Sequence, residues 1–202
     1  MAQCSRPAQD QGPGGPLALV VTGPPGVGKT TTGRQLARVL GAALLDLDTM
    51  TNPLVDVIVR LSGATGEYGD PALAATVRGP RYEALLSAAV DCLSAGTPVV
   101  LIAPFTAERS DAEAWRALAE RLRAASGNPH LVWLQADREL IAERMRRRGA
   151  ARDAGKLAHL DQGGALPDMA APEVPHIAVD ARLDPEAQAA AVAGAIASSP
   201  VG

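Results

Sequence analysis

The stretch Gly23-Pro-Pro-Gly-Val-Gly-Lys29-Thr30 decides the fold of this chain. It follows a continuous apolar run that begins at Leu17, and it opens residues 29–40, where apolar side chains recur at helical spacing until Gly41. The stretch satisfies the pattern G-x-x-x-x-G-K-[ST] in the strand-to-helix context that this pattern requires. Its glycines allow backbone N–H groups to point inward, and the helix N-terminus adds partial positive charge. We therefore predict a loop that binds the phosphates of a nucleotide.

Two side chains of this loop have predicted chemical roles. Lys29 is expected to bridge the β- and γ-phosphates as a catalytic residue, and Thr30 is expected to present its hydroxyl to Mg²⁺. Lys29 is conspicuous because the chain uses arginine at all but two of its 19 basic positions. The predicted nucleotide-binding residues of the loop are Gly23, Pro25, Gly26, Val27, Gly28, Lys29, Thr30 and Thr31.

Strand and helix patterns alternate along the rest of the chain. This alternation is typical of an α/β fold in which a parallel sheet lies between two layers of helices. The length of 202 residues favours one domain, so we expect a single domain over residues 16–200 after a disordered tail, residues 1–15. The predicted elements are strand 43–47, helix 53–62, helix 80–94, strand 98–103, a helix capped by Asp111, strand 130–134, a helix from Asp137 to Arg148, strand 175–179 and helix 184–198.

Composition narrows the functional classes. The formal charge is −3, without the basic excess of a nucleic-acid-binding protein. No apolar run reaches the roughly 18 to 20 residues of a membrane helix, and the N-terminus lacks a signal pattern. Cys4 and Cys92 offer neither a disulfide framework nor metal-ligand spacing. We expect a cytoplasmic monomer or homodimer that acts on a small molecule and binds neither nucleic acid nor membrane.

Two carboxylates follow the second predicted strand. Asp46 and Asp48 are two residues apart, so in an extended chain they project to the same side, toward the position of a transferred phosphate. One could hold Mg²⁺ through water, and the other could take the proton of an acceptor hydroxyl as a general base. The alternative is a pair of solvated acids, one of which caps the next helix.

The third apolar strand ends in Ala-Pro-Phe105, without the aspartate that holds magnesium in hydrolytic proteins with this type of loop. The chain also lacks an Asn-Lys-x-Asp segment that would read guanine. Pro104 and Phe105 form either the floor of an acceptor pocket or a loop contact to the core. Arg78 and Arg81 either bind an anionic acceptor or lie on the surface.

Basic residues cluster after the fourth predicted strand. Arginine's planar fork suits phosphate oxygens, and the Gly-rich stretch that follows is typical of a lid, residues 146–160, which closes over a nucleotide and excludes water. Arginines at a helix end also complement the helix dipole, which is the alternative role. Arg144 and Arg148 share one helical face, and the cluster is completed by Arg147, Arg152 and Lys156.

These residues together resemble the small P-loop kinases, which include shikimate, gluconate and adenylylsulfate kinases. The resemblance is strongest to chloramphenicol phosphotransferase-like and zeta-toxin-like enzymes, and it runs from about Leu17 to Ser198. It is based on the Gly23 to Thr30 loop, the Asp46-Leu47-Asp48 pair, the Ala-Pro-Phe strand end and the run from Glu143 to Leu157. It implies a P-loop NTPase fold with five parallel strands in the order 2-3-1-4-5 and a lid.

The resemblance also implies an activity: ATP- and Mg²⁺-dependent transfer of the γ-phosphate to a hydroxyl of a metabolite, sugar or antibiotic. Asp48 is similar to the acceptor-contacting carboxylate and candidate base, and Asp46 to the carboxylate beside the metal. Arg144 and Arg152 are the predicted nucleotide ligands of the lid, and Arg148 is its catalytic arginine. The glycine pairs and arginines with which shikimate kinase binds its acid are absent, so the named substrates are not transferable.

Two other functions remain open. A nucleoside or nucleotide kinase would use Arg78 and Arg81 for the phosphate of its acceptor. A non-catalytic or slowly hydrolysing nucleotide-binding module would bind ATP without forming a product. The predicted acceptor site comprises Asp46, Asp48, Arg78, Arg81 and Phe105.

Overall fold

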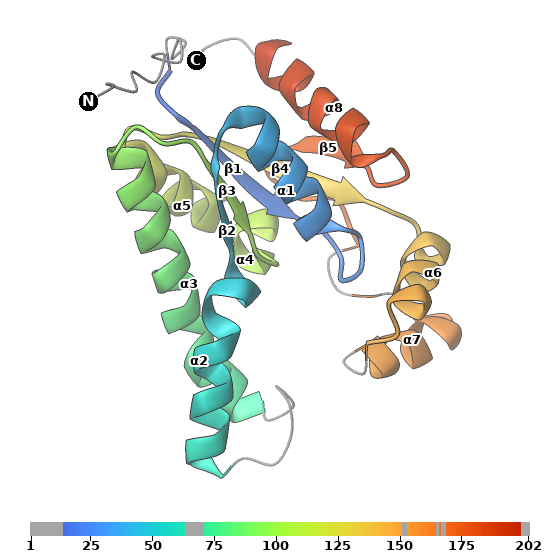
Figure 1. The fold of residues 1–202 in the computed structure, drawn as a ribbon. Helices are drawn as coiled ribbons and strands as arrows, with labels where there is room; N and C mark the ends of the chain where they lie inside the picture. Colours follow the sequence, from blue (N-terminus) through green and yellow to red (C-terminus); the bar gives the residue numbers. More distant parts are fainter. Residues whose placement is uncertain (1–13, 64–70, 151–152, 165, 167–168, 199–202) are drawn as a thin grey trace, which may run out of the picture.

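A five-stranded parallel sheet forms the centre of the computed structural model, which describes residues 14–63, 71–150, 153–164, 166 and 169–198 (Figure 1). The strands are ordered β2-β3-β1-β4-β5, and every neighbouring pair is parallel. The expected P-loop NTPase fold and strand order are thereby confirmed. The strands are β1 Leu17–Thr22, β2 Ala43–Asp46, β3 Val99–Ile102, β4 Asn128–Gln135 and β5 Ile177–Asp180.

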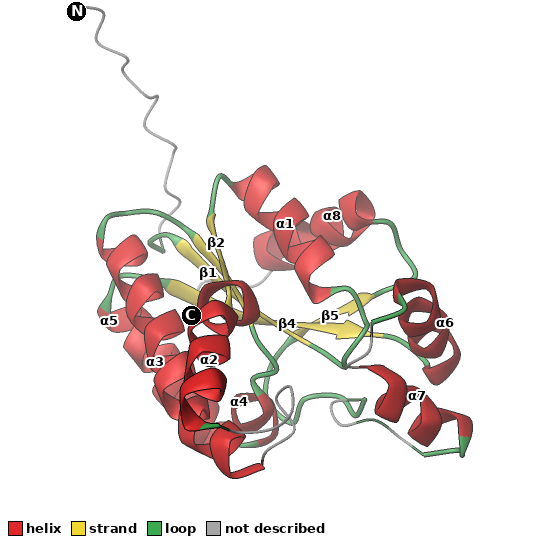
Figure 2. Ribbon diagram, turned by 60° about the horizontal axis from the view of Figure 1, so that its bottom comes forward, coloured by secondary structure: helices red, strands yellow, loops and turns green. Residues whose placement is uncertain are grey.

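Helices cover both faces of the sheet, as Figure 2 shows. Helices α1 and α8 lie on one face, and α3 and α5 lie on the other. A third group, α6 and α7, lies beyond the end of β4. The helices are α1 Lys29–Leu40, α2 Leu47–Ser62, α3 Pro71–Ser94, α4 Thr106–Ser110, α5 Ala112–Ala124, α6 Arg138–Arg148, α7 Ala154–Asp161 and α8 Pro185–Ser198.

Burial on both faces explains why the strands are continuously apolar. In β1, Ala18 and Val20 pack into the core under α3 and α5, whereas Leu19 and Val21 pack into the core under α1 and α8. All four side chains are fully buried. A parallel strand with helices on both sides has no solvent-facing position, so period-two alternation is lost and only a short apolar run remains.

Several elements differ from the sequence-based prediction. Strand β4 begins two residues earlier than predicted, at Asn128, and β5 begins two residues later, at Ile177. Strand β2 ends at Asp46 rather than Leu47, because Asp46 caps α2, which therefore begins six residues before the predicted helix at 53. Helix α3 begins at Pro71 rather than at residue 80, because Pro80 lies inside a helix instead of starting one. Residues 64–70, between α2 and α3, lie outside the described residues, as does the predicted tail except for Gly14 and Gly15.

Helix α7 and the short helix α4 were not predicted. The stretch after Gly149 has little helical periodicity of its own, but Leu160 and Leu166 pack with Ile141 and Met145 of α6 in a separate small core. Tertiary packing therefore stabilises α7 where local sequence does not indicate a helix. None of the helices in the described part of the chain is both long and apolar enough to span a membrane.

Candidate active site

The loop between β1 and α1 takes a shape that requires glycine. Gly23 has φ 145°, and a Cβ there would lie 2.6 Å from the carbonyl oxygen of Leu134. Gly28 has φ 108° and occupies the N-cap position of α1, where no side chain caps the helix. The first N–H groups of α1 therefore point into the cavity formed by the loop and are available to an anion.

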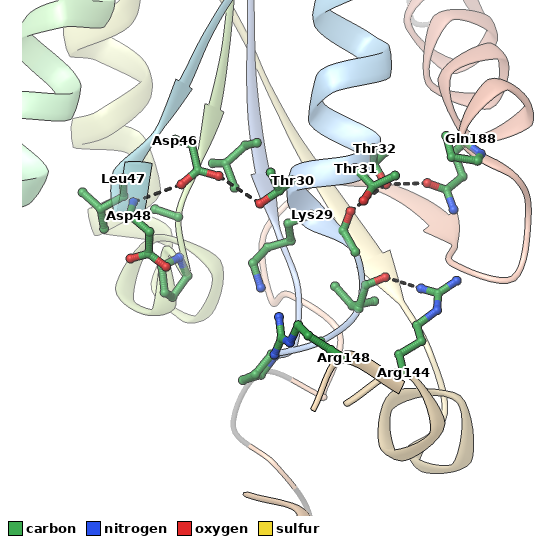
Figure 3. Close-up of a pocket in the computed structure, with 18 of the residues that line it drawn as sticks. Lys29, Thr30, Thr31, Thr32, Asp46, Leu47, Asp48, Arg144, Arg148 and Gln188 are labelled. Atoms are coloured by element: carbon green, nitrogen blue, oxygen red, sulfur yellow. Dashed lines mark hydrogen bonds between the residues drawn. The ribbon is translucent and has the colours of Figure 1, made fainter. Parts of the chain in front are cut away.

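Lys29 reaches back across this loop. Its Nζ donates to the carbonyl oxygens of Gly23 at 2.7 Å and Pro24 at 3.1 Å. The ammonium thus lies over the concave side of the loop, at the position where phosphate oxygens would replace the carbonyl oxygens. Figure 3 shows Lys29 and Arg148 extending into the same part of the cavity from opposite sides.

Asp46 combines two of the roles considered from the sequence. Its Oδ1 accepts from the backbone N–H groups of Asp48 at 3.0 Å and Thr49 at 3.2 Å, which caps α2. Its Oδ2 accepts from the hydroxyl of Thr30 at 2.9 Å (Figure 3). The residue is 8% exposed, so the cap fixes the orientation of a carboxylate that faces the loop.

The Thr30 and Asp46 pair suits a magnesium ion. Mg²⁺ prefers hard oxygen ligands and keeps several waters, so a hydroxyl and one carboxylate beside a polyphosphate match its requirements. The two oxygens come from the start of α1 and the end of β2, next to the predicted phosphate position. Their donor set therefore fits the metal that the sequence implied, although no cluster of three or more His, Cys, Asp or Glu side chains occurs among the described residues.

Asp48 lines the same cavity and lies on the other side of Lys29 from Arg144 (Figure 3). Because α2 begins at Leu47, Asp48 belongs to the first helical turn, and the prediction of two carboxylates on one face of an extended strand was wrong. Its side chain is 62% exposed, and Oδ1 accepts from Nη2 of Arg81 at 2.7 Å. A carboxylate held in place but open to solvent can contact an acceptor.

Arg81 lies behind Asp48 rather than in the cavity wall. Its Nε donates to the hydroxyl of Thr51 at 2.7 Å, and Nη2 also donates to Oδ1 of Asn52 at 2.8 Å. Arg78 donates to the hydroxyl of Thr106 at 2.7 Å, and its guanidinium lies 5.2 Å from the centre of the Tyr82 ring. Neither arginine is among the residues that line the cavity.

Phe105 belongs to the core, so its placement in the acceptor site needs correction. Its ring is fully buried and makes an edge-on contact with Tyr82 at 5.7 Å between ring centres. Its backbone has φ 45°, and its N–H donates to the Tyr82 hydroxyl at 3.1 Å. Pro104 lines the cavity instead, and its carbonyl accepts from the hydroxyl of Thr22 at 2.6 Å. Of the two alternatives for this strand end, Phe105 makes the loop contact to the core.

The phosphate loop, Thr30, Asp46, Asp48 and Pro104 line one cavity of about 800 Å³, a volume in the usual range of ligand sites. Six basic side chains and only three acidic ones line it, although the chain as a whole carries a formal charge of −3. This local excess of positive charge suits a polyphosphate. The basic residues are Lys29, Arg144, Arg147, Arg148, Lys156 and Arg182, and the acidic ones are Asp46, Asp48 and Asp184.

The arginines of α6 are engaged in different ways. Arg144 donates to the carbonyl of Val27 in the loop and, at 2.6 Å, to the carbonyl of Ala181 after β5. It therefore joins α6 to the two segments that frame the nucleotide side of the cavity. Arg148 pairs with Asp153 in the turn before α7. Arg152 lies outside the described residues.

Sequence reasoning missed the part of the site that α8 contributes. Gln188 is 4% exposed; its Oε1 lies 2.5 Å from the hydroxyl of Thr32, and its Nε2 donates to the carbonyl of Leu183 at 2.7 Å. This side chain fixes the loop 181–185, which lines the cavity through Arg182, Leu183 and Asp184. The sequence shows only a single glutamine in an Ala-rich helix. Its burial, which obliges the amide to find partners, is visible only in the structure.

Comparison with known proteins gives the family. The model of a P-loop family described as "AAA domain" matches residues 19–166, so the chain belongs to this family. No curated protein gave a significant sequence match.

Solved structures with the same fold include several kinases. The APS kinase CysC of Mycobacterium tuberculosis, in complex with AMPPNP and APS, superposes with a TM-score of 0.58 at 22% identity, over 92% of this chain and 100% of that one. A gluconokinase from Sinorhizobium meliloti superposes with a TM-score of 0.54 at 21% identity, over 90% of this chain and 92% of that one. Shikimate kinase of Aquifex aeolicus superposes with a TM-score of 0.52 at 15% identity, over 92% of this chain and 99% of that one. The resemblance to small P-loop kinases is thereby confirmed at the level of the fold.

Proposed function

We propose that the protein is an ATP- and Mg²⁺-dependent phosphotransferase that moves the γ-phosphate to a hydroxyl group of a small molecule. The observation that carries this proposal is a single cavity with a phosphate loop on one wall, an open carboxylate, Asp48, on another, and basic lid residues on a third. A protein that only bound nucleotide would not need an exposed carboxylate oriented beside the transferred phosphate. The kinase neighbours of known activity support the same class.

The residues suggest how the transfer proceeds. The acceptor oxygen attacks the γ-phosphorus, the bond to the bridging oxygen of ADP breaks, and the hydroxyl proton passes to the Asp48 carboxylate. Lys29 and Arg148 stabilise the charge on the transferred group and on the departing ADP. Thr30 and Asp46 would hold Mg²⁺, which neutralises charge between the β- and γ-phosphates when bound.

Arg81 supports this role for Asp48. Its guanidinium holds one carboxylate oxygen, Oδ1, and is itself fixed by Thr51 and Asn52. The other oxygen remains for the acceptor. Because Arg78 and Arg81 are already engaged with other side chains and do not line the cavity, nothing in this geometry favours an acceptor that carries a phosphate, as a nucleotide kinase would require.

The strand end after β3 also favours transfer over hydrolysis. Ala103 and Pro104 line the cavity where hydrolytic P-loop proteins place an aspartate. We expect the segment 146–160, which comprises the end of α6 and most of α7, to act as the lid that keeps water from the phosphate. We further propose a cytoplasmic protein, monomeric or homodimeric, formed by one domain over residues 16–200.

The test is a search for product by mass spectrometry. The protein is incubated with Mg-ATP and a pooled library of hydroxylated metabolites, sugars, nucleosides and antibiotics, and a gain of about 80 Da on one compound identifies the acceptor. Lys29→Ala should abolish the product, and Asp48→Asn should reduce kcat strongly while ATP still binds. Asp56→Asn, an exposed position on the same helix outside the cavity, is the matched control.

Each result decides between the alternatives. Phosphorylation of a nucleoside or nucleotide would establish a nucleoside or nucleotide kinase. ATP binding that depends on Lys29 without any product would favour a binding module. An Asp48→Asn variant with unchanged turnover would remove Asp48 as the base.

A further inference from the structure

The lid side of the cavity contains a buried carboxylate without an assigned role. The backbone N–H of Asp153 donates to the carbonyl of Ala150 at 2.9 Å, and its side chain is 1% exposed. Asp153 occupies the N-cap position of α7, yet its carboxylate accepts no hydrogen bond from the backbone of that helix. It turns to α6 instead, where Arg148 donates to Oδ2 from Nε at 2.8 Å and from Nη2 at 2.5 Å.

This pair is not built mainly for stability. In the part of the chain that the structure describes, no hydrogen-bond donor reaches the other oxygen of Asp153, Oδ1. Burial of a carboxylate with one cation partner carries a desolvation penalty that the pairing often fails to offset, and a well-packed apolar side chain would join the two helices better. The remaining advantage of the carboxylate is the orientation that it imposes on the guanidinium.

That orientation serves the cavity. The Arg148 side chain is 40% exposed and lines the cavity. Asp153 binds the edge of the guanidinium that is formed by Nε and Nη2, so Nη1 is left to donate to an oxygen in the cavity. Figure 3 shows the side chain extending toward the end of the cavity where Lys29 lies. Lys156 follows Asp153 by three residues, about one helical turn, and lines the same cavity.

We propose that Asp153 is a positioning residue that orients Arg148 toward the terminal phosphate of a bound nucleoside triphosphate. This inference extends the proposed function, because it assumes that the loop binds such a nucleotide. The pair then favours a triphosphate over a diphosphate, since only the triphosphate carries the group that Arg148 approaches. Arg148 contacts the nucleotide, and Asp153 acts only through Arg148.

Calorimetric binding of ADP and of a non-hydrolysable ATP analogue, both with Mg²⁺, tests the proposal. Asp153→Asn should lower the ratio of the ADP Kd to the analogue Kd by about tenfold, and Arg148→Ala should lower it by as much. The double variant should fall no further, because the two residues act as one unit. An unchanged ratio in Asp153→Asn, or effects that multiply in the double variant, would overturn the proposal.

The chain offers a matched control. Arg146 and Asp161 form another ion pair between α6 and α7, at 2.5 Å, with both side chains 56% exposed and outside the cavity lining. Asp161→Asn should leave the ratio unchanged. If it lowered the ratio as Asp153→Asn does, joining the two helices would be sufficient and no orienting role would remain.

A second variant covers the case in which Asp153→Asn does not fold. Arg148→Lys keeps a cation beside the buried carboxylate but removes the planar fork, so it should lower the ratio nearly as far as Arg148→Ala. A wild-type ratio in Arg148→Lys would show that orientation is not needed. The assay uses no acceptor, so the two proposals can fail separately. If the protein is not a phosphotransferase, Asp153→Asn should still lower the ratio. If only the present inference is wrong, the enzyme is active and Asp153→Asn has the wild-type ratio.

Discussion

The proposed nucleotide half and the proposed acceptor half of the cavity are built in different ways. The phosphate-binding part of the nucleotide half is formed by consecutive residues, since each residue from Pro25 to Thr32 lines the cavity. The acceptor half is formed by side chains from separate elements: Asp48 from α2, supported by Arg81 from α3, and Pro104 after β3. A site made from consecutive backbone atoms leaves a sequence motif, whereas a site assembled from distant side chains leaves none.

We expect the largest effect on stability and on ATP binding from a methyl group added at Gly23 in the phosphate loop. Gly23→Ala places a Cβ 2.6 Å from the carbonyl oxygen of Leu134, and the alanine would have to adopt φ 145°, which side-chain-bearing residues rarely do. We expect a loss of about 1–3 kcal/mol in the free energy of unfolding and at least a tenfold weaker binding of ATP. Urea unfolding and calorimetry measure the two effects.

Gly194→Ala is the matched control for this change. Gly194 lies inside α8, and among the described residues a Cβ at this position would meet no atom outside its own stretch of helix within 4 Å. Here alanine should stabilise the protein by about 0.5–1 kcal/mol and leave ATP binding unchanged. Equal effects of the two variants would contradict the view that the loop depends on glycine.

Asp46→Asn acts where the two halves meet. Asparagine caps a helix about as well as aspartate, so stability should change little, but the charge that would hold Mg²⁺ is lost. We expect the Mg²⁺ concentration for half-maximal ATP binding to rise about 10- to 100-fold. Asp111→Asn is the control, because Asp111 caps α5 through the same two kinds of hydrogen bond outside the cavity lining. Equal magnesium dependence in both variants would remove Asp46 from the metal site.

The Phe105→Leu variant tests whether Phe105 belongs to the core or to the acceptor site. The ring is fully buried and packs on Tyr82, so its loss should lower the free energy of unfolding by about 1–2 kcal/mol. The KM for the acceptor should stay the same. A raised KM with unchanged stability would return Phe105 to the acceptor site, where the sequence had placed it.

We expect the smallest effect, on thermal stability alone, from a substitution at Glu83, which lies outside both halves of the cavity. Hydrogen bonds from Arg121 and Ser87 lower the pKa of Glu83 from 4.5 to about 2, although Glu83 is exposed. A carboxyl with a depressed pKa in the folded state adds stability above its unfolded pKa, and this contribution is lost as the pH falls from about 4.5 toward 2. Glu83→Gln should lower Tm by less than about 2 °C at pH 7, and the difference should vanish near pH 2. A constant difference across this range would exclude the ion pair as its cause.

Local patterns were sufficient for the parts of the fold in which neighbours in sequence are neighbours in space. Helix α1 was predicted to the residue, because Gly28 and Gly41 bound an apolar face with Leu36 at its centre. Helix α7 was missed, because its stability depends on the contact of Leu160 with Ile141 and Met145, which lie outside the local sequence. The start of α2 was missed because the same carboxylate, Asp46, ends the strand and caps the helix.

The sequence by itself determined the phosphate-binding loop, the alternation of strands and helices, and the residues that could hold a metal. These features follow from backbone conformation and burial, which act over a few residues. Only the tertiary structure decided that Arg81 fixes Asp48, that Phe105 belongs to the core and that Gln188 fixes the loop after β5. These side chains have partners 23 to 156 residues away in the sequence: Tyr82 for Phe105, Asp48 for Arg81 and Thr32 for Gln188. No local pattern specifies which of these partners folding brings together.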